Sequence, residues 1–317
     1  PPISCGGYQY QQRDQEDITG EVRLSSERDQ RLRWMVGANY LDVDRHLVVA
    51  YSGDLGLGAS PRGFNPTAGP NPTDLLYDDN LLSEVIAFFG NVEYDISEKV
   101  EVSLALRYDE EKRTVDNNVP KLNPQTPGFG AFGFPVCTSD PCGYYINPYY
   151  NANPDASSIP SREETFDQLQ PKLSIAYQPS DSVTYFASYG IGFRSGGFNS
   201  QGTTATLEQF FGNLATGDGT KNLNELKDSF DKEISKAFEM GFKARLLDNT
   251  LALNGAVYLT DTEDMQDFSF FAGPFGSLRV VTNIDEAEIR GAELDFKWKA
   301  SDSVTLYGGV GITDTEI

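Results

Sequence analysis

The octapeptide YQPSDSVT at residues 177–184 indicates the fold, because two similar octapeptides recur in the chain, YDISEKVE at 94–101 and WKASDSVT at 298–305. Each has an aromatic residue, two further residues, then Ser, an acidic residue, any residue, Val, and Thr or Glu. The Ser–acid pair favours a tight turn through side-chain bonds to the local backbone. An aromatic residue at a fixed offset from such turns is typical of the interfacial girdle of a membrane barrel.

Strict apolar–polar alternation surrounds these turns. Between 100 and 108, Val, Leu and Tyr alternate with Glu, Ser, Ala and Arg, and the same pattern returns at 239–246 and 292–299. Period-two alternation predicts strands with one apolar face and one polar face. A strand of a soluble β-sandwich would show the same alternation, so the pattern alone leaves both folds open.

The lengths of the connections separate the two folds. Strands are expected at roughly 17–26, 30–44, 84–95, 99–114, 162–178, 182–195, 228–247, 250–270, 277–299 and 303–315. Tight turns near 27–29, 96–98, 179–181, 248–249 and 300–302 alternate with long links at 45–83, 115–161 and 196–227, and a shorter one near 271–276. Short and long connections that alternate are typical of an outer-membrane barrel. The sequence therefore predicts an all-β, antiparallel up-and-down meander of about 10 strands, with the tight turns at one rim and the long links at the other.

The alternation also predicts which side chains face lipid. The apolar set is expected to point outward, and it comprises Leu104, Leu106, Phe242, Leu294 and Phe296. The charged set is expected to point into the lumen, and it comprises Glu101, Arg107, Lys243, Glu293 and Asp295.

Composition excludes several classes of protein. The 317 residues carry a formal charge of −22, with a pI near 4.3, which argues against nucleic acid as a partner because phosphate binding needs clustered Lys and Arg. No run of apolar residues approaches the roughly 18 that a spanning helix needs. The acidic charge is interpreted as that of solvated loops and rims, although affinity for cationic or metal-bearing ligands stays open.

The chain has three cysteines, Cys5, Cys137 and Cys142, and one histidine, His46. This set does not meet the four-ligand spacing of a structural zinc site. Cys137 and Cys142 are separated by four residues in a segment rich in Pro, Gly and Tyr, which suits a small disulfide loop in an oxidising compartment. Cys5 is then unpaired, or its partner lies outside this chain.

One longer segment carries a resemblance to a known family. PKLSIAYQPSDSVTYFASYGIGFRSGGFN at 171–199 resembles a signature stretch of TonB-dependent outer-membrane receptors, and similar stretches lie at 21–41, 89–115, 238–266 and 281–311. The motif at its end comprises Gly192, Phe193, Arg194, Ser195, Gly196, Gly197, Phe198 and Asn199. The resemblance implies that residues 1–317 are the middle part of a barrel of about 22 strands, without its plug domain and C-terminal strands.

The resemblance also implies a function and partners. The chain would belong to an active-transport receptor of the bacterial outer membrane that binds a scarce nutrient, most commonly a ferric siderophore. The expected partners are outer-membrane lipid, the small ligand, and the TonB energy complex acting through the absent plug, with no cofactor. Candidate ligand contacts are Tyr144, Tyr145, Tyr149 and Tyr150 and the end of 193–199, although the sequence identifies neither the ligand nor its contacts. A passive porin-like channel and a structural or adhesive barrel are the alternatives.

Residues for catalysis or for a metal site do not form a pattern, so we do not expect an enzyme. His46, beside Asp44 and Arg45, is interpreted as a solvated histidine in a link. The segment GFRSGGFN lacks the lysine of a phosphate-binding loop, so its glycines are expected to permit a bend or a close backbone approach. Asp261, Glu263, Asp264 and Asp267 lack the order of a calcium loop and are expected to be lumen or rim charges.

Overall fold

A single antiparallel sheet of ten strands makes up most of the described chain. The computed structural model describes residues 7–53, 75–119, 121–124, 143–145, 149–200, 202–204, 207, 226–273 and 276–317. The strands of the sheet are β1 (Gly7–Ser25), β2 (Leu32–Gly53), β3 (Leu75–Ser97), β4 (Val100–Asn117), β7 (Arg162–Ser180), β8 (Val183–Arg194), β11 (Glu233–Leu246), β12 (Leu251–Gly273), β13 (Gly276–Lys299) and β14 (Thr305–Glu316). Each pairs with the next in chain order, as predicted for a meander.

Shorter elements lie outside this sheet. Strands β5 (Leu122–Pro124) and β6 (Gly143–Tyr145) form one small pair, and β9 (Gly197–Phe198) and β10 (Ser229–Phe230) form another. The helix α1 covers Tyr149–Ala152. In the described residues, no helix is long and apolar enough to cross a membrane.

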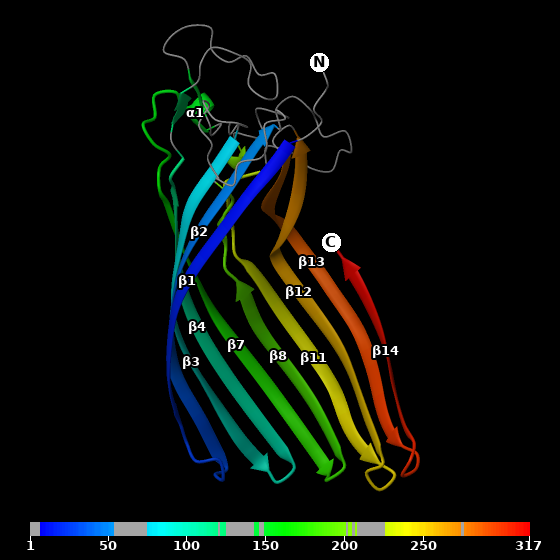
Figure 1. Ribbon diagram of the computed structural model, residues 1–317. Coiled ribbons are helices and arrows are strands. Elements are labelled where there is room, and N and C mark those ends of the chain that lie inside the picture. The colour runs from blue at the N-terminus through cyan, green and yellow to red at the C-terminus, as the bar shows by residue number, and fades with distance from the viewer. Residues whose placement is uncertain are drawn as a thin grey trace.

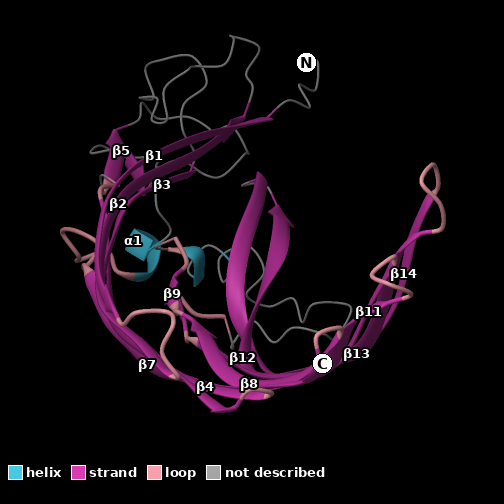
Figure 2. Ribbon diagram, turned by 90° about the horizontal axis from the view of Figure 1, so that it is seen from below, coloured by secondary structure: helices cyan, strands magenta, loops and turns pink. Residues whose placement is uncertain are grey.

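The sheet curves into an open arc, and its two ends differ. All five tight turns lie together at the lower rim in Figure 1, and the strand ends that border the long links lie away from that rim, with β8 ending lower than β2 and β12. Viewed along the strands, the sheet is an incomplete ring, with α1 and β9 inside the arc (Figure 2). The predicted topology is therefore confirmed.

The two faces of the sheet have opposite character, and the register defines them. Leu104, Leu294 and Phe296 fall on one face, with large exposed fractions, and Phe242 shares that face because it flanks Gly255 together with Leu294. Glu101, Arg107, Lys243, Glu293 and Asp295 fall on the other face. Because β9 packs on this polar face and lies inside the arc, the polar face is concave and the apolar face convex. The sequence predicted these orientations correctly.

The apolar part of the convex face is a band of limited height. On β4 it runs from Val102 through Leu104 and Leu106 to Tyr108, after which Glu110 begins the polar part of the strand. The other strands repeat this change with Glu16, Asp42, Glu84, Asp167, Asp261, Glu288 and Asp314 at or just beyond the end of their apolar runs. A band of alternating apolar residues with aromatic borders is the lipid-facing surface of a barrel.

The strands extend further toward the upper rim than the sequence predicted. The link predicted at 45–83 is shorter, because β2 continues to Gly53 and β3 begins at Leu75. The predicted strand 228–247 is divided into β10 and β11. Above the apolar band, apolar residues of β2 fall on both faces, since the consecutive residues Val48, Val49 and Ala50 are all buried, so the alternation that marks a half-buried strand is lost there.

Candidate functional site

The motif at 192–199 forms a junction at the upper rim, on the concave side. Strand β8 ends at Arg194, and Gly197 and Phe198 then leave the large sheet to pair with Phe230 and Ser229. The Arg194 guanidinium bonds both carboxylate oxygens of Glu233, at 3.2 and 2.9 Å, which ties the end of β8 to the start of β11. The chain therefore turns from the wall into the mouth at this motif.

Two glycines of the motif are required by close approaches. A Cβ at Gly196 would lie 2.4 Å from the Phe166 ring and 2.5 Å from the Phe230 carbonyl oxygen, and a Cβ at Gly197 would lie 2.9 Å from the Phe230 ring. Real Cβ atoms essentially never come this close to backbone or ring atoms. Gly192 differs, because nothing lies within 4 Å of its Cβ position.

Asn199 joins this junction to β13. Its side chain is 5 % exposed and donates through Nδ2 to the carbonyl oxygens of Lys227 at 2.9 Å and Val281 at 2.8 Å. Its Oδ1 accepts from the Val281 backbone N–H at 2.8 Å. We call these three bonds the Asn199 clasp; since the amide is buried, each bond satisfies a group that would otherwise be costly to bury.

The β12–β13 hairpin reverses its faces at Asp264. Below this residue, Thr262 on β12 faces the concave side, whereas above it Phe271, an odd-numbered residue, packs toward that side. Asp264 has a φ of 51°, in the left-handed region that side-chain-bearing residues rarely adopt. Asn283 holds this turn by donating to the carbonyl oxygens of Asp264 at 2.7 Å and Asp231 at 3.0 Å.

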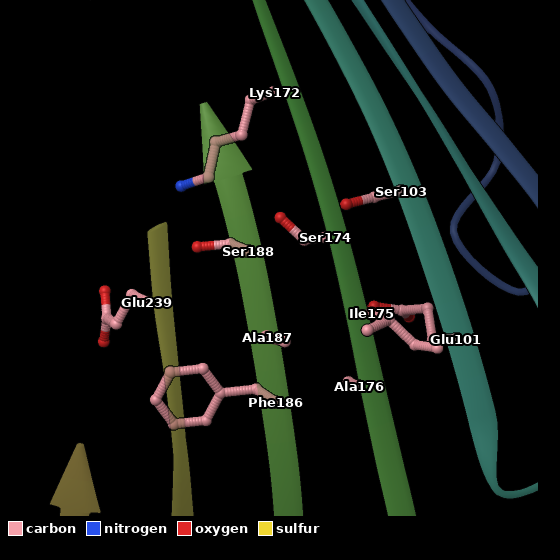
Figure 3. A pocket seen from close by; sticks show the side chains of 10 residues that line it. All are labelled: Glu101, Ser103, Lys172, Ser174, Ile175, Ala176, Phe186, Ala187, Ser188 and Glu239. Carbon is pink, nitrogen blue, oxygen red and sulfur yellow. The ribbon is translucent and has the colours of Figure 1, made fainter. Parts of the chain in front are cut away.

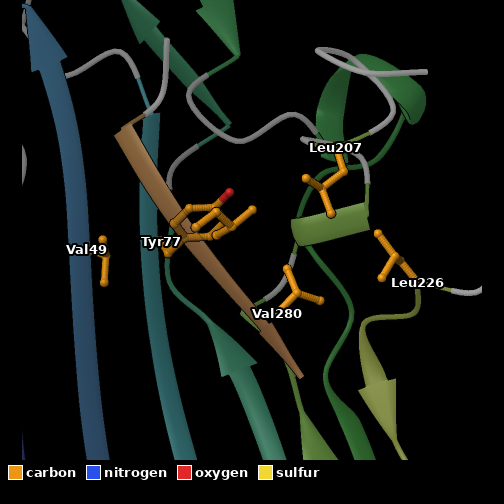
Figure 4. Close-up of a cluster of buried hydrophobic side chains, with 6 residues drawn as sticks. Val49, Tyr77, Leu207, Leu226 and Val280 are labelled. Atoms are coloured by element: carbon orange, nitrogen blue, oxygen red, sulfur yellow. The ribbon is translucent and has the colours of Figure 1, made fainter. Parts of the chain in front are cut away.

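The reversed part of the hairpin packs on an apolar cluster inside the mouth. Val280 and Leu278 of β13 are buried against Val49 of β2 and Tyr77 of β3. Leu207 and Leu226 complete the cluster, and Figure 4 shows these side chains converging from the wall, the hairpin and the intervening segment. Together with the Asn199 clasp, this cluster fixes the upper hairpin within the arc.

The concave face nearer the turns is polar, and two of its arginines are paired with carboxylates. Arg33 bonds Asp95 through two nitrogens, at 2.7 and 2.9 Å, and Glu101 at 2.6 Å. Arg107 likewise bonds the buried Asp109 at 2.7 and 2.6 Å. An open hollow of about 250 Å³ lies on this face, lined by the serines 103, 174 and 188 and by charged groups that include Lys172 and Glu239 (Figure 3).

The candidate tyrosines have different surroundings. Tyr150 is 1 % exposed, its hydroxyl donates to the Val119 carbonyl oxygen at 3.4 Å, and burial raises the pKa of that hydroxyl. Tyr149 is half-buried and packs edge-on against the Tyr150 ring at 5.6 Å. The side chains of Tyr144 and Tyr145 lie outside the described residues, and of the two that are described, Tyr149 is the more accessible.

His46 lies within β2, and its interpretation as a histidine in a link is corrected. Its Nε2 is 2.7 Å from Asp78 Oδ1 on β3, and its direct neighbours in the sheet are Asn80 and Asp14. Glu263 is paired with Lys236 on the convex face, at the rim. Over the described ranges, no group of three His, Cys, Asp or Glu residues is placed to hold a metal ion.

Cys5, Cys137 and Cys142 lie outside the described residues. The disulfide between Cys137 and Cys142 therefore stays a prediction. It requires Cα atoms roughly 4.4–6.8 Å apart, and mass spectrometry of the oxidised protein would detect it.

Sequence reasoning missed the partners that hold the junction. Gln266 donates to the Ser195 carbonyl oxygen at 2.9 Å, and Asn283 accepts from the Asp231 N–H at 2.7 Å. Single amides in strands carry no periodic signal. The sequence feature that came nearest to indicating the junction was the run of polar residues that interrupts the expected strand 250–270.

Comparisons with known proteins agree with this geometry. Residues 5–316 match the family model described as TonB dependent receptor-like, beta-barrel. The structure is similar to the ferric yersiniabactin uptake receptor FyuA from Yersinia pestis, with a TM-score of 0.63, 14% identity, and coverage of 100% of this chain and 38% of that one. It is also similar to the copper transporter OprC (TM-score 0.60, 16% identity, 96% of this chain and 39% of that one). The siderophore receptor PiuA from Acinetobacter baumannii gives a TM-score of 0.55 at 18% identity, over 96% of this chain and 39% of that one. The chain thus spans well under half the length of these structures.

Proposed function

Because the chain belongs to the TonB-dependent receptor β-barrel family, we propose that it forms the middle of the wall of a receptor that imports a ferric siderophore with energy from TonB. Proteins of this family are outer-membrane barrels that transport ligands and are not enzymes. The convex apolar band carries the proposal, since it gives the wall a lipid-facing side and leaves the concave side polar.

The mouth supports a receptor more than a simple channel. The segment after β8 turns into the arc at the motif, and the β12–β13 hairpin packs on it there. An open pore would keep its mouth clear for passive diffusion, whereas a receptor presents ordered surfaces to a ligand. Energy coupling would act through a plug region outside these 317 residues.

The cargo is proposed from similarity of fold only. The neighbours named above include receptors for ferric yersiniabactin and other siderophores, and a copper transporter. Iron chelates are the most frequent cargo among these names, so a ferric siderophore is the first ligand class to test.

The experiment uses the complete receptor that contains this chain. A strain that lacks the receptor gene is complemented with the complete gene, and uptake of ⁵⁵Fe-loaded siderophores is measured under iron limitation, with TonB present or deleted. We expect saturable uptake that disappears without TonB. Uptake that is unsaturable and unchanged by loss of TonB would instead establish a passive channel.

A further inference from the structure

Four arginines lie on the concave face at the upper rim, each on a different strand. They are Arg13 on β1, Arg45 on β2, Arg113 on β4 and Arg162 on β7. The register places them on one face: Arg13 is opposite Leu47, Arg45 opposite Leu81, Arg113 opposite Ser83, and Arg162 opposite Val115. We call these four residues the arginine patch.

Arg45, a central member of the patch, has no counter-charge among the residues that the structure describes. Arg45 is exposed, and within the described ranges it makes no ion pair or side-chain hydrogen bond. The charged groups that act on it are Arg13 and Arg113, and both repel it. Arg13 itself bonds only the neutral Gln11 in this part of the chain, at 3.4 Å.

Among the described residues, carboxylates on this face pair with two members of the patch, Arg113 and Arg162. Glu111 pairs with Arg113 at 3.1 Å, but the Arg113 Nε is buried with no partner in the described structure. Glu164 lies 3.8 Å from Arg162. Asp79, opposite Leu47, is buried and accepts from the Asn117 amide at 2.7 Å.

Unpaired arginines are unexpected in this chain. Acidic residues outnumber Lys and Arg by 47 to 25, and the concave arginines nearer the turns, Arg33 and Arg107, bind carboxylates closely. Like charges without counter-ions destabilise a fold, so a site that keeps them is suited to a ligand that neutralises them.

The family motif borders the patch. A Cβ at Gly197 would lie 3.3 Å from Arg113 Nη1, so any larger residue there would press on the guanidinium. The Arg162 guanidinium lies 5.2 Å from the centre of the Phe198 ring. The turn that brings the chain into the mouth therefore also forms one wall of the patch.

The height of the patch suits a ligand that arrives from outside. On β2, Arg45 follows Asp42 and Asp44, which lie beyond the last aromatic residue of the apolar band, Tyr40. On β4, Arg113 likewise follows Tyr108 and Glu110. The patch therefore lies in the mouth, above the part of the lumen that the lipid-facing band surrounds.

From this geometry we propose that the arginine patch binds an anion that bears several carboxylates. Guanidinium groups bind carboxylates through paired N–H donors in a fixed fork. The inference rests on the proposed function and deepens it, because it makes the cargo a multiply anionic iron chelate.

The test measures binding to the purified complete receptor in detergent, with iron-free citrate as the tricarboxylate probe. Calorimetry at low salt should show saturable binding that weakens as salt is added, because salt screens exposed charges. Arg45→Gln and Arg113→Gln should each weaken binding by at least about tenfold. Arg45→Lys should retain part of the affinity, which separates loss of charge from loss of fold. The control is Arg290→Gln, on the convex face and paired with Asp314, which should bind as the parent does.

Two results would overturn the proposal that the arginine patch binds carboxylates. In the first, the parent receptor does not bind citrate; in the second, both glutamine variants bind citrate as the parent does. If carboxylates of the plug already neutralise the arginines, the parent fails to bind and the first result is obtained. Calorimetry does not depend on iron uptake. Arginine-dependent citrate binding without TonB-dependent uptake would therefore refute the proposed function but support the proposal that the arginine patch binds carboxylates. TonB-dependent uptake of neutral chelates without citrate binding would support the proposed function and refute the proposal that the arginine patch binds carboxylates.

Discussion

The wall between the turns and the apolar band differs from the junction in the mouth in how its residues are held. In the wall each strand pairs through its backbone with the wall strand before it and the one after it, and alternation assigns every side chain to lipid or lumen. In the junction, Asn199, Gln266 and Asn283 join segments far apart in the sequence, and the β12–β13 hairpin reverses its faces at Asp264. The wall depends on a repeated pattern, whereas the junction depends on single residues.

The largest effect is expected when a charge is placed in the lipid-facing band. Leu294 is 43 % exposed on the convex face, and Glu293 beside it faces the lumen. Leu294→Arg places a charge at mid-bilayer, which costs about 2–4 kcal/mol, and should prevent assembly of the complete receptor. Glu293→Gln should assemble normally. Heat-modifiable mobility in gel electrophoresis measures both, and equal assembly of the two variants would contradict the assignment of the faces.

A smaller and local effect is expected in the junction. Asn199→Ala removes the clasp and leaves the N–H and C=O of the half-buried Val281 without their partner, at up to about 1–3 kcal/mol for each group. Hydrogen exchange should rise in 276–283 and stay unchanged in the wall. Asn254→Ala, which removes only an exposed bond to Asp295, is the matched control. Faster exchange throughout the sheet would show that wall and junction are not separable.

Gly196 and Gly192 of the motif test whether close packing is what distinguishes the junction from the wall. Gly196→Ala introduces contacts of 2.4 Å with Phe166 and 2.5 Å with the Phe230 carbonyl oxygen, and should destabilise the junction by about 1–3 kcal/mol. Gly192→Ala meets nothing within 4 Å and should be nearly neutral. Urea unfolding in lipid vesicles, monitored at the junction, measures the stability of both variants. Equal losses of stability would mean that close contacts are not the reason for glycine at position 196.

The smallest effect is expected at a turn of the wall. Leu247 has a φ of 52°, which costs about 1–2 kcal/mol for a residue with a Cβ. Leu247→Gly relieves this cost but adds about 0.5–1 kcal/mol of freedom to the unfolded chain, so a net gain below about 1 kcal/mol is expected in urea unfolding. Leu246→Gly, at the last residue of β11, should lose stability instead. A gain in stability at both positions would show that relief of the positive φ at Leu247 is not the cause.

Sequence patterns predicted the wall well because its physics is periodic. The recurring turns at 94–101, 177–184 and 298–305, the alternation in strands such as 100–108 and the alternating lengths of the connections together predicted strand order, faces and rims. The upper ends of β2 and β3 were missed because apolar and polar residues no longer alternate there, as in the run of Val48, Val49 and Ala50. The arginine patch was also missed, since residues 13, 45, 113 and 162 come together only through the register.

The Asn199 clasp also determines an order of events in assembly. Each strand pair of the sheet joins neighbours in the chain, so it can form as soon as its two strands are present. The clasp reaches a residue 82 positions downstream, and closing so long a loop carries an entropy cost that a tight hairpin avoids. The junction can therefore close only after β13 has joined the sheet, and its closure marks the time at which the wall from β8 to β13 is complete.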